Sequence, residues 1–146
     1  MGISRGIEWD YFAFVSYISG WSVQAIIINK INGVIQLEDG YVETKKIEIP
    51  LTKEFIAGME SCFEEINIFD WAKGNYNPCV DGEQWSFEFY RGDERILLRS
   101  GTNAYPNGYG KWIDFYASLL KDNGVTEVHT CYRKEREGYI FREYYD

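Results

Sequence analysis

The segment "WSVQAIIINKINGVIQLEDGYVETKKIEI" (Trp21–Ile49) predicts an antiparallel sheet, because it holds two hairpin signals between strand-like runs. Asn32-Gly33 and Asp39-Gly40 are dipeptides that favour the tight turns of antiparallel hairpins. The β-branched and apolar runs around them are typical of strands, and Pro50 ends the last one. Connections this short leave no room for a parallel crossover.

The preceding run, "IEWDYFAFVSYI" (Ile7–Ile18), supplies one more strand, which Gly20 separates from the stretch above. Aromatic and β-branched residues occupy both faces of this run, a pattern typical of a strand that is covered on both sides. The first fifty residues therefore predict a four-stranded antiparallel meander.

Two later segments have the period of amphipathic helices. "LTKEFIAGMESCFEEI" (Leu51–Ile66) carries Thr52 as a candidate N-cap, and "KWIDFYASLLKD" (Lys111–Asp122) is followed by Asn123-Gly124, a common helix stop. Each segment has one apolar stripe at helical spacing. The stripes consist of Phe55, Met59, Cys62, Phe63 and Ile66 in the first helix, and of Trp112, Phe115, Tyr116, Leu119 and Leu120 in the second.

The remaining segments complete the predicted architecture. "QWSFEFYR" and "ERILLRS" alternate apolar and polar residues around Gly92-Asp93, which predicts a second hairpin with one solvated face. Residues 67–83 have no period, so we expect irregular chain there, and the tail predicts two short strands around Glu137-Gly138. The fold class is thus α+β: residues 1–146 form a single domain, with an antiparallel sheet and two amphipathic helices packed on one face.

Charge and composition narrow the function classes. The net charge of −8 disfavours direct binding to nucleic acid or to an anionic membrane, and favours a protein partner with a basic surface. Three widely spaced cysteines do not form a disulfide framework, and the N-terminus does not read as a signal peptide, so we expect a cytoplasmic protein. No zinc spacing or phosphate loop occurs, so we expect no cofactor.

One pattern spans the region from Phe55 to Leu120. An amphipathic helix is followed by Trp71 and Tyr76, by "DG" and a strand tryptophan, and by "GTNAYP" (Gly101–Pro106) before the final helix. This pattern resembles a group of small bacterial proteins that share a "DG…W … G-x-N-A-Y-P" signature. Such small acidic proteins often act as immunity proteins of toxin systems or as phage counter-defence inhibitors. The signature residues mainly shape the backbone, so the resemblance implies no catalysis.

Acidic residues around the first helix are candidates for a partner-binding face. They would occupy a basic site by mimicking nucleic-acid phosphates; the alternative is a solvated helix face, with Asp81 in a turn and Trp85 in the core. The candidates are Glu60, Glu64, Glu65, Asp70, Asp81 and Glu83.

The loop "SGTNAYPNGYG" (Ser100–Gly110) also has two interpretations. Asn103, Tyr105 and Tyr109 are residue types that suit a recognition surface. The alternative is a connector that needs special backbone angles, with Tyr105 packed on Trp85 or Trp112.

We therefore expect a non-enzymatic inhibitor that binds and occludes a protein. A homo-oligomer is compatible with the sequence, because exposed edge strands can pair between copies. The alternative is a domain that binds a nucleotide or sugar in a pocket between sheet and helices, lined by Trp9, Trp21, Trp85 and Trp112. Catalysis would need a buried carboxylate or thiol cluster, and no sequence motif marks one. His129 and Cys131 form a pair without a third orienting residue.

Overall fold

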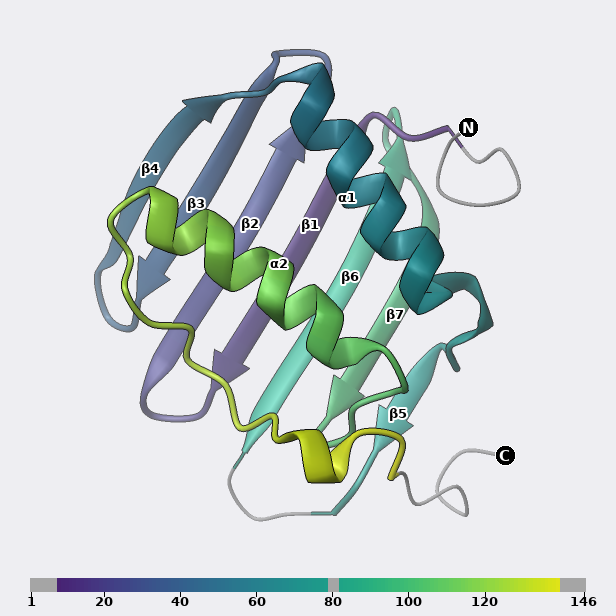
Figure 1. Ribbon diagram of the computed structural model, residues 1–146. Helices are drawn as coiled ribbons and strands as arrows, with labels where there is room; N and C mark the ends of the chain where they lie inside the picture. Colours follow the sequence, from purple (N-terminus) through teal and green to yellow (C-terminus); the bar gives the residue numbers. More distant parts are fainter. Residues whose placement is uncertain (1–7, 79–81, 140–146) are drawn as a thin grey trace.

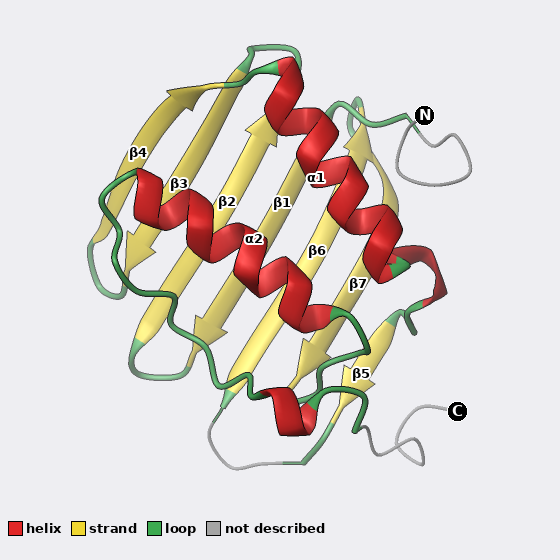
Figure 2. Ribbon diagram, in the orientation of Figure 1, coloured by secondary structure: helices red, strands yellow, loops and turns green. Residues whose placement is uncertain are grey.

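The computed structural model describes residues 8–78 and 82–139. Strands, two α-helices and two short 3-10 helices (η) follow one another in these residues (Figure 2). Their order and bounds are β1 Tyr11–Ile18, β2 Ser22–Asn29, β3 Val34–Gly40, β4 Thr44–Pro50, α1 Lys53–Ile66, η1 Ile68–Asp70, β5 Gly74–Tyr76, β6 Glu83–Arg91, β7 Glu94–Thr102, α2 Tyr109–Asp122 and η2 Lys134–Arg136.

The strands of the described residues form one seven-stranded sheet in the order β4-β3-β2-β1-β6-β7-β5. Every neighbouring pair is antiparallel except β5 and β7, which run parallel. β6 pairs with β1 in a register that sets Phe87 opposite Phe14, and this pairing joins the hairpin to the meander. The predicted α+β class and the N-terminal meander are therefore confirmed.

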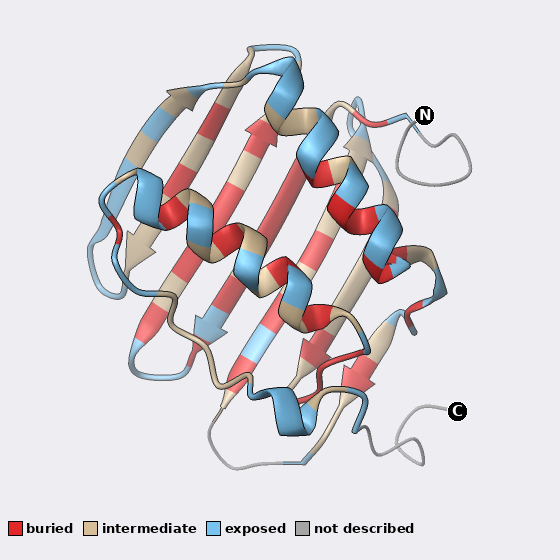
Figure 3. Cartoon of the chain, viewed as in Figure 1, coloured by how far each residue is buried: buried red, intermediate tan, exposed pale blue. Residues whose placement is uncertain are grey.

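Both helices lie across the same face of the sheet (Figure 1). The alternation of the strands sends Phe12, Phe14 and Phe87 toward the helices, where they contact the rings of Phe63 on α1 and Trp112 on α2. The Phe63 and Trp112 rings stack with centroids 5.3 Å apart. The buried positions of each helix follow its inner side (Figure 3), so the core is a layer of aromatic rings between sheet and helices.

The helix ends follow the sequence signals. The Thr52 hydroxyl accepts a hydrogen bond from the Phe55 N–H at 3.0 Å, which confirms the predicted N-cap. α1 ends at Asn67, which adopts left-handed angles with φ 59°. α2 starts two residues earlier than predicted, at Tyr109, because Gly108 with φ 96° turns the chain into the helix.

Three local predictions were wrong. Asp39-Gly40 is not the turn of the second hairpin: both residues pair with β4, and the turn consists of residues 41–43. Gly74–Tyr76 forms a parallel strand that is too short to show a period. Residues 125–133 of the tail form no strand, because they run across the end of the sheet, where side chains of the sheet bind them (Figure 1). The second predicted tail strand falls mostly on residues 140–146, outside the described residues.

The second face of β1 carries Tyr11, Ala13, Val15 and Tyr17, and neither helix covers it. The expectation of a strand covered on both sides is therefore wrong for the described part of the chain. This face, called the open face below, is partly apolar at its centre.

Candidate functional site

Glu83 is a carboxylate enclosed in the interior, with 0% of its surface exposed. Its Oε1 accepts hydrogen bonds from the Tyr105 hydroxyl at 2.7 Å, the Thr130 hydroxyl at 2.7 Å and the Cys131 N–H at 3.0 Å. Its Oε2 accepts one from the Ser16 hydroxyl. A buried carboxylate is tolerated only when its acceptor sites are filled, and here four donors from three segments of the chain fill them.

The signature residues build the frame around this carboxylate. Asn103 stands at φ 54°, and its Oδ1 accepts the Glu83 N–H at 2.9 Å while its own N–H donates to the Glu83 carbonyl at 2.9 Å. The Trp85 indole N–H donates to the Ala104 carbonyl at 2.9 Å. Gly101 is required because a Cβ there would collide with the Trp85 ring. The "W … G-x-N-A-Y" residues therefore tie the start of β6 to the end of β7.

The structure corrects four of the predicted partner-binding residues. Glu83, Asn103, Tyr105 and Tyr109 are buried, whereas the predicted partner-binding role would need them at the surface. Tyr105 packs against Tyr109 and Tyr132, with ring centroids 4.9 and 5.4 Å apart. Burial, and next the nearby Glu83 carboxylate, raise the pKa of Tyr105 and of Tyr109 well above the ordinary tyrosine value. The loop acts as the connector that the alternative interpretation described.

Glu137 anchors the tail to the start of α2. Its carboxylate accepts the N–H groups of Gly108 and Gly110, both at 3.0 Å, and the Tyr132 hydroxyl at 2.6 Å. The Glu137 carboxylate accepts hydrogen bonds from otherwise unpaired N–H groups at the positive end of the α2 dipole, where Gly108 offers no side-chain cap. Burial alone would raise the pKa of Glu137, but these three hydrogen bonds together lower it below the usual value.

Ser22, His129 and Glu127 form a hydrogen-bonded row like that of a serine hydrolase. The Ser22 Oγ lies 2.7 Å from His129 Nδ1, and His129 Nε2 lies 3.1 Å from Glu127 Oε1. A nucleophile must reach its substrate, and Ser22 exposes only 2% of its surface. The row holds the tail against β2, together with Gln24, which bonds the His129 N–H and the Glu127 carbonyl.

The structure separates the remaining acidic candidates. Glu64, Glu65 and Asp70 are exposed at the C-terminal end of α1 and on η1. Glu60 instead accepts the Trp9 indole N–H at 3.1 Å and lies 4.0 Å from Lys30. Asp81 lies outside the described residues. The surface formed by Glu64, Glu65 and Asp70 is called the acidic end of α1 below.

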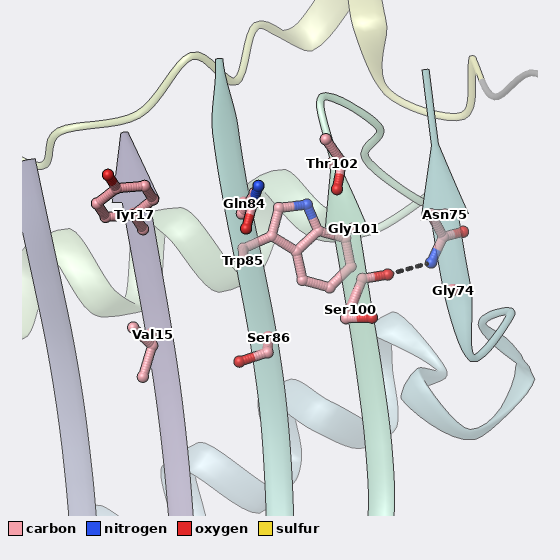
Figure 4. A pocket seen from close by; sticks show the side chains of 10 residues that line it. All are labelled: Val15, Tyr17, Gly74, Asn75, Gln84, Trp85, Ser86, Ser100, Gly101 and Thr102. Atoms are coloured by element: carbon pink, nitrogen blue, oxygen red, sulfur yellow. Dashed lines mark hydrogen bonds between the residues drawn. The ribbon is translucent and has the colours of Figure 1, made fainter. Parts of the chain in front are cut away.

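The pocket predicted between sheet and helices is filled by the core. Trp9, Trp85 and Trp112 expose 2% of their surface or less, and Trp21 lies at the surface. A hollow with a volume of about 370 Å³ does lie on the open face (Figure 4). Hydroxyl and amide side chains from several strands surround it, beside Tyr17: Asn75, Gln84, Ser86, Ser100 and Thr102.

Some deciding contacts were missed by sequence reasoning. Glu83 alternates in phase with Trp85, Phe87 and Phe89 along β6, and this spacing is the sequence signal that could have identified it as buried. Ser16 is likewise in phase with Phe14, but nothing in the sequence pairs it with Glu83. The anchors in the tail have no period and left no signal.

Within residues 8–78 and 82–139, no three acidic, histidine or cysteine side chains gather as metal ligands would. The helices found in the same residues are too short or too polar to cross a membrane. Comparisons with protein-family models, with curated proteins and with solved structures found no match. The resemblance to immunity proteins and phage inhibitors therefore stays a prediction.

Proposed function

We propose that this chain is a non-enzymatic inhibitor that binds the basic surface of a protein partner through the acidic end of α1. The observation that supports this proposal is a reversed charge pattern. Glu64 and Glu65 occupy the last turn of α1, where no basic residue stands. The helix dipole makes that end negative, so each carboxylate there costs about 0.3–1 kcal/mol, reduced by salt.

The structure compensates this cost only in part. Glu65 lies 2.5 Å from Lys111, but both side chains are more than half exposed, and such surface pairs contribute little. Glu64 has no ion-pair partner among the described residues. Local rules that a sequence breaks without a gain in stability are expected at functional sites. A basic partner supplies the missing gain.

The buried features support a binding role over catalysis. The Glu83 carboxylate has no exposed surface, and its two oxygens already accept four hydrogen bonds. Ser22 is equally closed to a substrate. The resemblance described above suggests the setting: toxin immunity or phage counter-defence, in which a small acidic protein occludes a basic site.

The test is binding to candidate partners encoded beside this gene. Each candidate and this chain are purified separately, and the dissociation constant of their complex is measured by titration calorimetry at about 50 mM and about 300 mM salt. We expect a complex that is weaker at the higher salt concentration, and a further loss of affinity in the variant Glu64→Lys. Glu48→Lys is the matched control, because exposed Glu48 lies on β4 and points to the open face.

Two failures have different meanings. If no candidate binds at micromolar concentration, the inhibitor proposal is wrong. If a candidate binds but Glu64→Lys behaves like Glu48→Lys, the function stands and the acidic end of α1 is not the contact.

A further inference from the structure

Exposed apolar side chains gather at one end of the sheet. Six large apolar side chains are exposed in the described residues, and three of them belong to two neighbouring connections of the meander. These three form the sheet-end patch: Trp21 (54% exposed), Tyr41 (46%) and Val42 (87%). Single exposed apolar residues are ordinary on a protein surface, but a gathering of them marks an interaction site.

The strand register brings the patch together. Val23 on β2 pairs with Tyr17 on β1 and with Gly40 on β3, so the residues after Gly40 lie beside the β1–β2 turn. Trp21 belongs to that turn, and Tyr41 and Val42 belong to the β3–β4 connection. Both connections lie at the same end of the sheet (Figure 1), and both are exposed (Figure 3).

Trp21 is held in place although it is exposed. Its ring packs against the His129 ring, with centroids 4.7 Å apart. His129 is fixed in turn by Ser22 at 2.7 Å and by its own N–H, which donates to Gln24 Oε1 at 2.8 Å. A side chain that is ordered before binding loses little conformational entropy when a partner arrives. Aromatic side chains held this way are typical anchors of protein interfaces.

The charges beside the patch are unbalanced toward acid. Lys45 and Lys46 on β4 stand opposite Asp39 and Glu38, which balances these four charges against each other. Two further carboxylates stay at the rim: Glu43 is exposed within the β3–β4 connection, and the Glu127 side chain is 73% exposed next to His129. Among the described residues, neither has a lysine or arginine within ion-pair distance.

We propose that the sheet-end patch binds an arginine side chain presented by a segment of a partner protein. A guanidinium packs on the faces of tryptophan and tyrosine rings while its N–H groups bind carboxylates, and this surface offers both at once. The patch is distinct from the acidic end of α1. The proposal therefore holds whether or not α1 contacts a partner.

The experiment uses the full chain with ¹⁵N-labelled tryptophan and short capped peptides. Acetyl-Gly-Arg-Gly-amide is titrated while the indole N–H signals are followed by NMR, and Trp21→Phe assigns the Trp21 signal. The control peptide carries citrulline, which has the shape of arginine without its charge. We expect a saturable shift of the Trp21 signal and no shift of the buried Trp85 signal.

The affinity for the citrulline peptide should be at least about two- to fivefold weaker, as the loss of an exposed cation–π contact implies. Glu127→Gln should weaken arginine binding, whereas Glu94→Gln, a matched change at the exposed start of β7, should not. An unmoved Trp21 signal, equal shifts with both peptides, or equal effects of the two variants would each overturn the proposal. None of these results bears on the α1 complex, which is measured separately.

Discussion

Replacing Glu83 by leucine tests whether the buried carboxylate holds the domain together. Leucine removes the acceptor of four donors. Two of these donors, the hydroxyls of Ser16 and Tyr105, belong to residues with at most 4% exposed surface and cannot turn to water. Each orphaned buried donor costs about 1–3 kcal/mol, so Glu83→Leu should lower the free energy of unfolding by about 2–6 kcal/mol. Thr130 and Cys131 are half-buried and can rehydrate.

The assay is urea unfolding followed by tryptophan fluorescence and circular dichroism. A lower midpoint with an unchanged slope reports a loss of stability. Glu88→Leu is the matched control, because Glu88 lies on the open face of the same strand and bonds Tyr90 and Arg95 at the surface. Surface pairs of this kind contribute about 0–1 kcal/mol. Trypsin should also cut the tail of Glu83→Leu sooner, at Arg133 and Lys134.

The reasoning fails if Glu83→Leu and Glu88→Leu unfold at the same urea concentration. If Glu83→Leu is strongly destabilising, a double-mutant cycle with Ser16→Ala measures how much of the loss comes from the Ser16–Glu83 hydrogen bond. If Ser16→Ala costs as much in Glu83→Leu as in the wild type, the Ser16 hydrogen bond is not coupled to the carboxylate.

Two further predictions concern backbone space and pH. Gly101→Ala should lower the free energy of unfolding by about 1–3 kcal/mol, because its Cβ overlaps the Trp85 ring. Gly58→Ala should raise it by about 0.5–1 kcal/mol, because alanine is a better helix former and its Cβ meets Phe115 at an ordinary 3.7 Å. Thermal unfolding midpoints of the two variants test both predictions. Because the folded pKa of Glu137 lies below the usual 4.5, its contribution is present above that pH and is lost as pH falls through the folded value. Glu137→Gln should therefore flatten the acid limb of a stability profile, and an unchanged limb would contradict the assignment.

Periodicity predicted the larger elements because each buries a continuous apolar face. The alternation of β6 and the stripes of both helices place their side chains against the core as expected. The phase of β7 was predicted wrongly: Leu97 and Arg99 stand opposite Phe89 and Phe87 on the helix-covered face, where apolar neighbours of Leu97 were expected. The order of the strands was not predictable in this way. β1 pairs with β6 across more than sixty residues, and the apolar pattern of β1 fits several neighbours equally well.

The tail and β5 fall outside what periodicity can predict. β5 has three residues, and its parallel pairing with β7 depends on Lys73 and Asn77, whose backbones bond Ser100 and Thr102. The tail is positioned by individual polar contacts to Gln24, Glu83 and the start of α2. Such contacts join residues about 30 to 100 positions apart, and a single sequence carries no signal for them.

The location of the signature residues changes what the resemblance can imply. Gly101 leaves room for the Trp85 ring because it has no Cβ. Asn103 forms hydrogen bonds with the backbone N–H and carbonyl of Glu83, and the Tyr105 hydroxyl donates to the Glu83 carboxylate. All of these contacts lie inside the molecule. A protein that shares these residues is therefore expected to share the contacts between the start of β6 and the end of β7, and the helix that follows, whatever it binds. Differences in function must arise on surfaces outside the signature, such as the acidic end of α1 and the sheet-end patch.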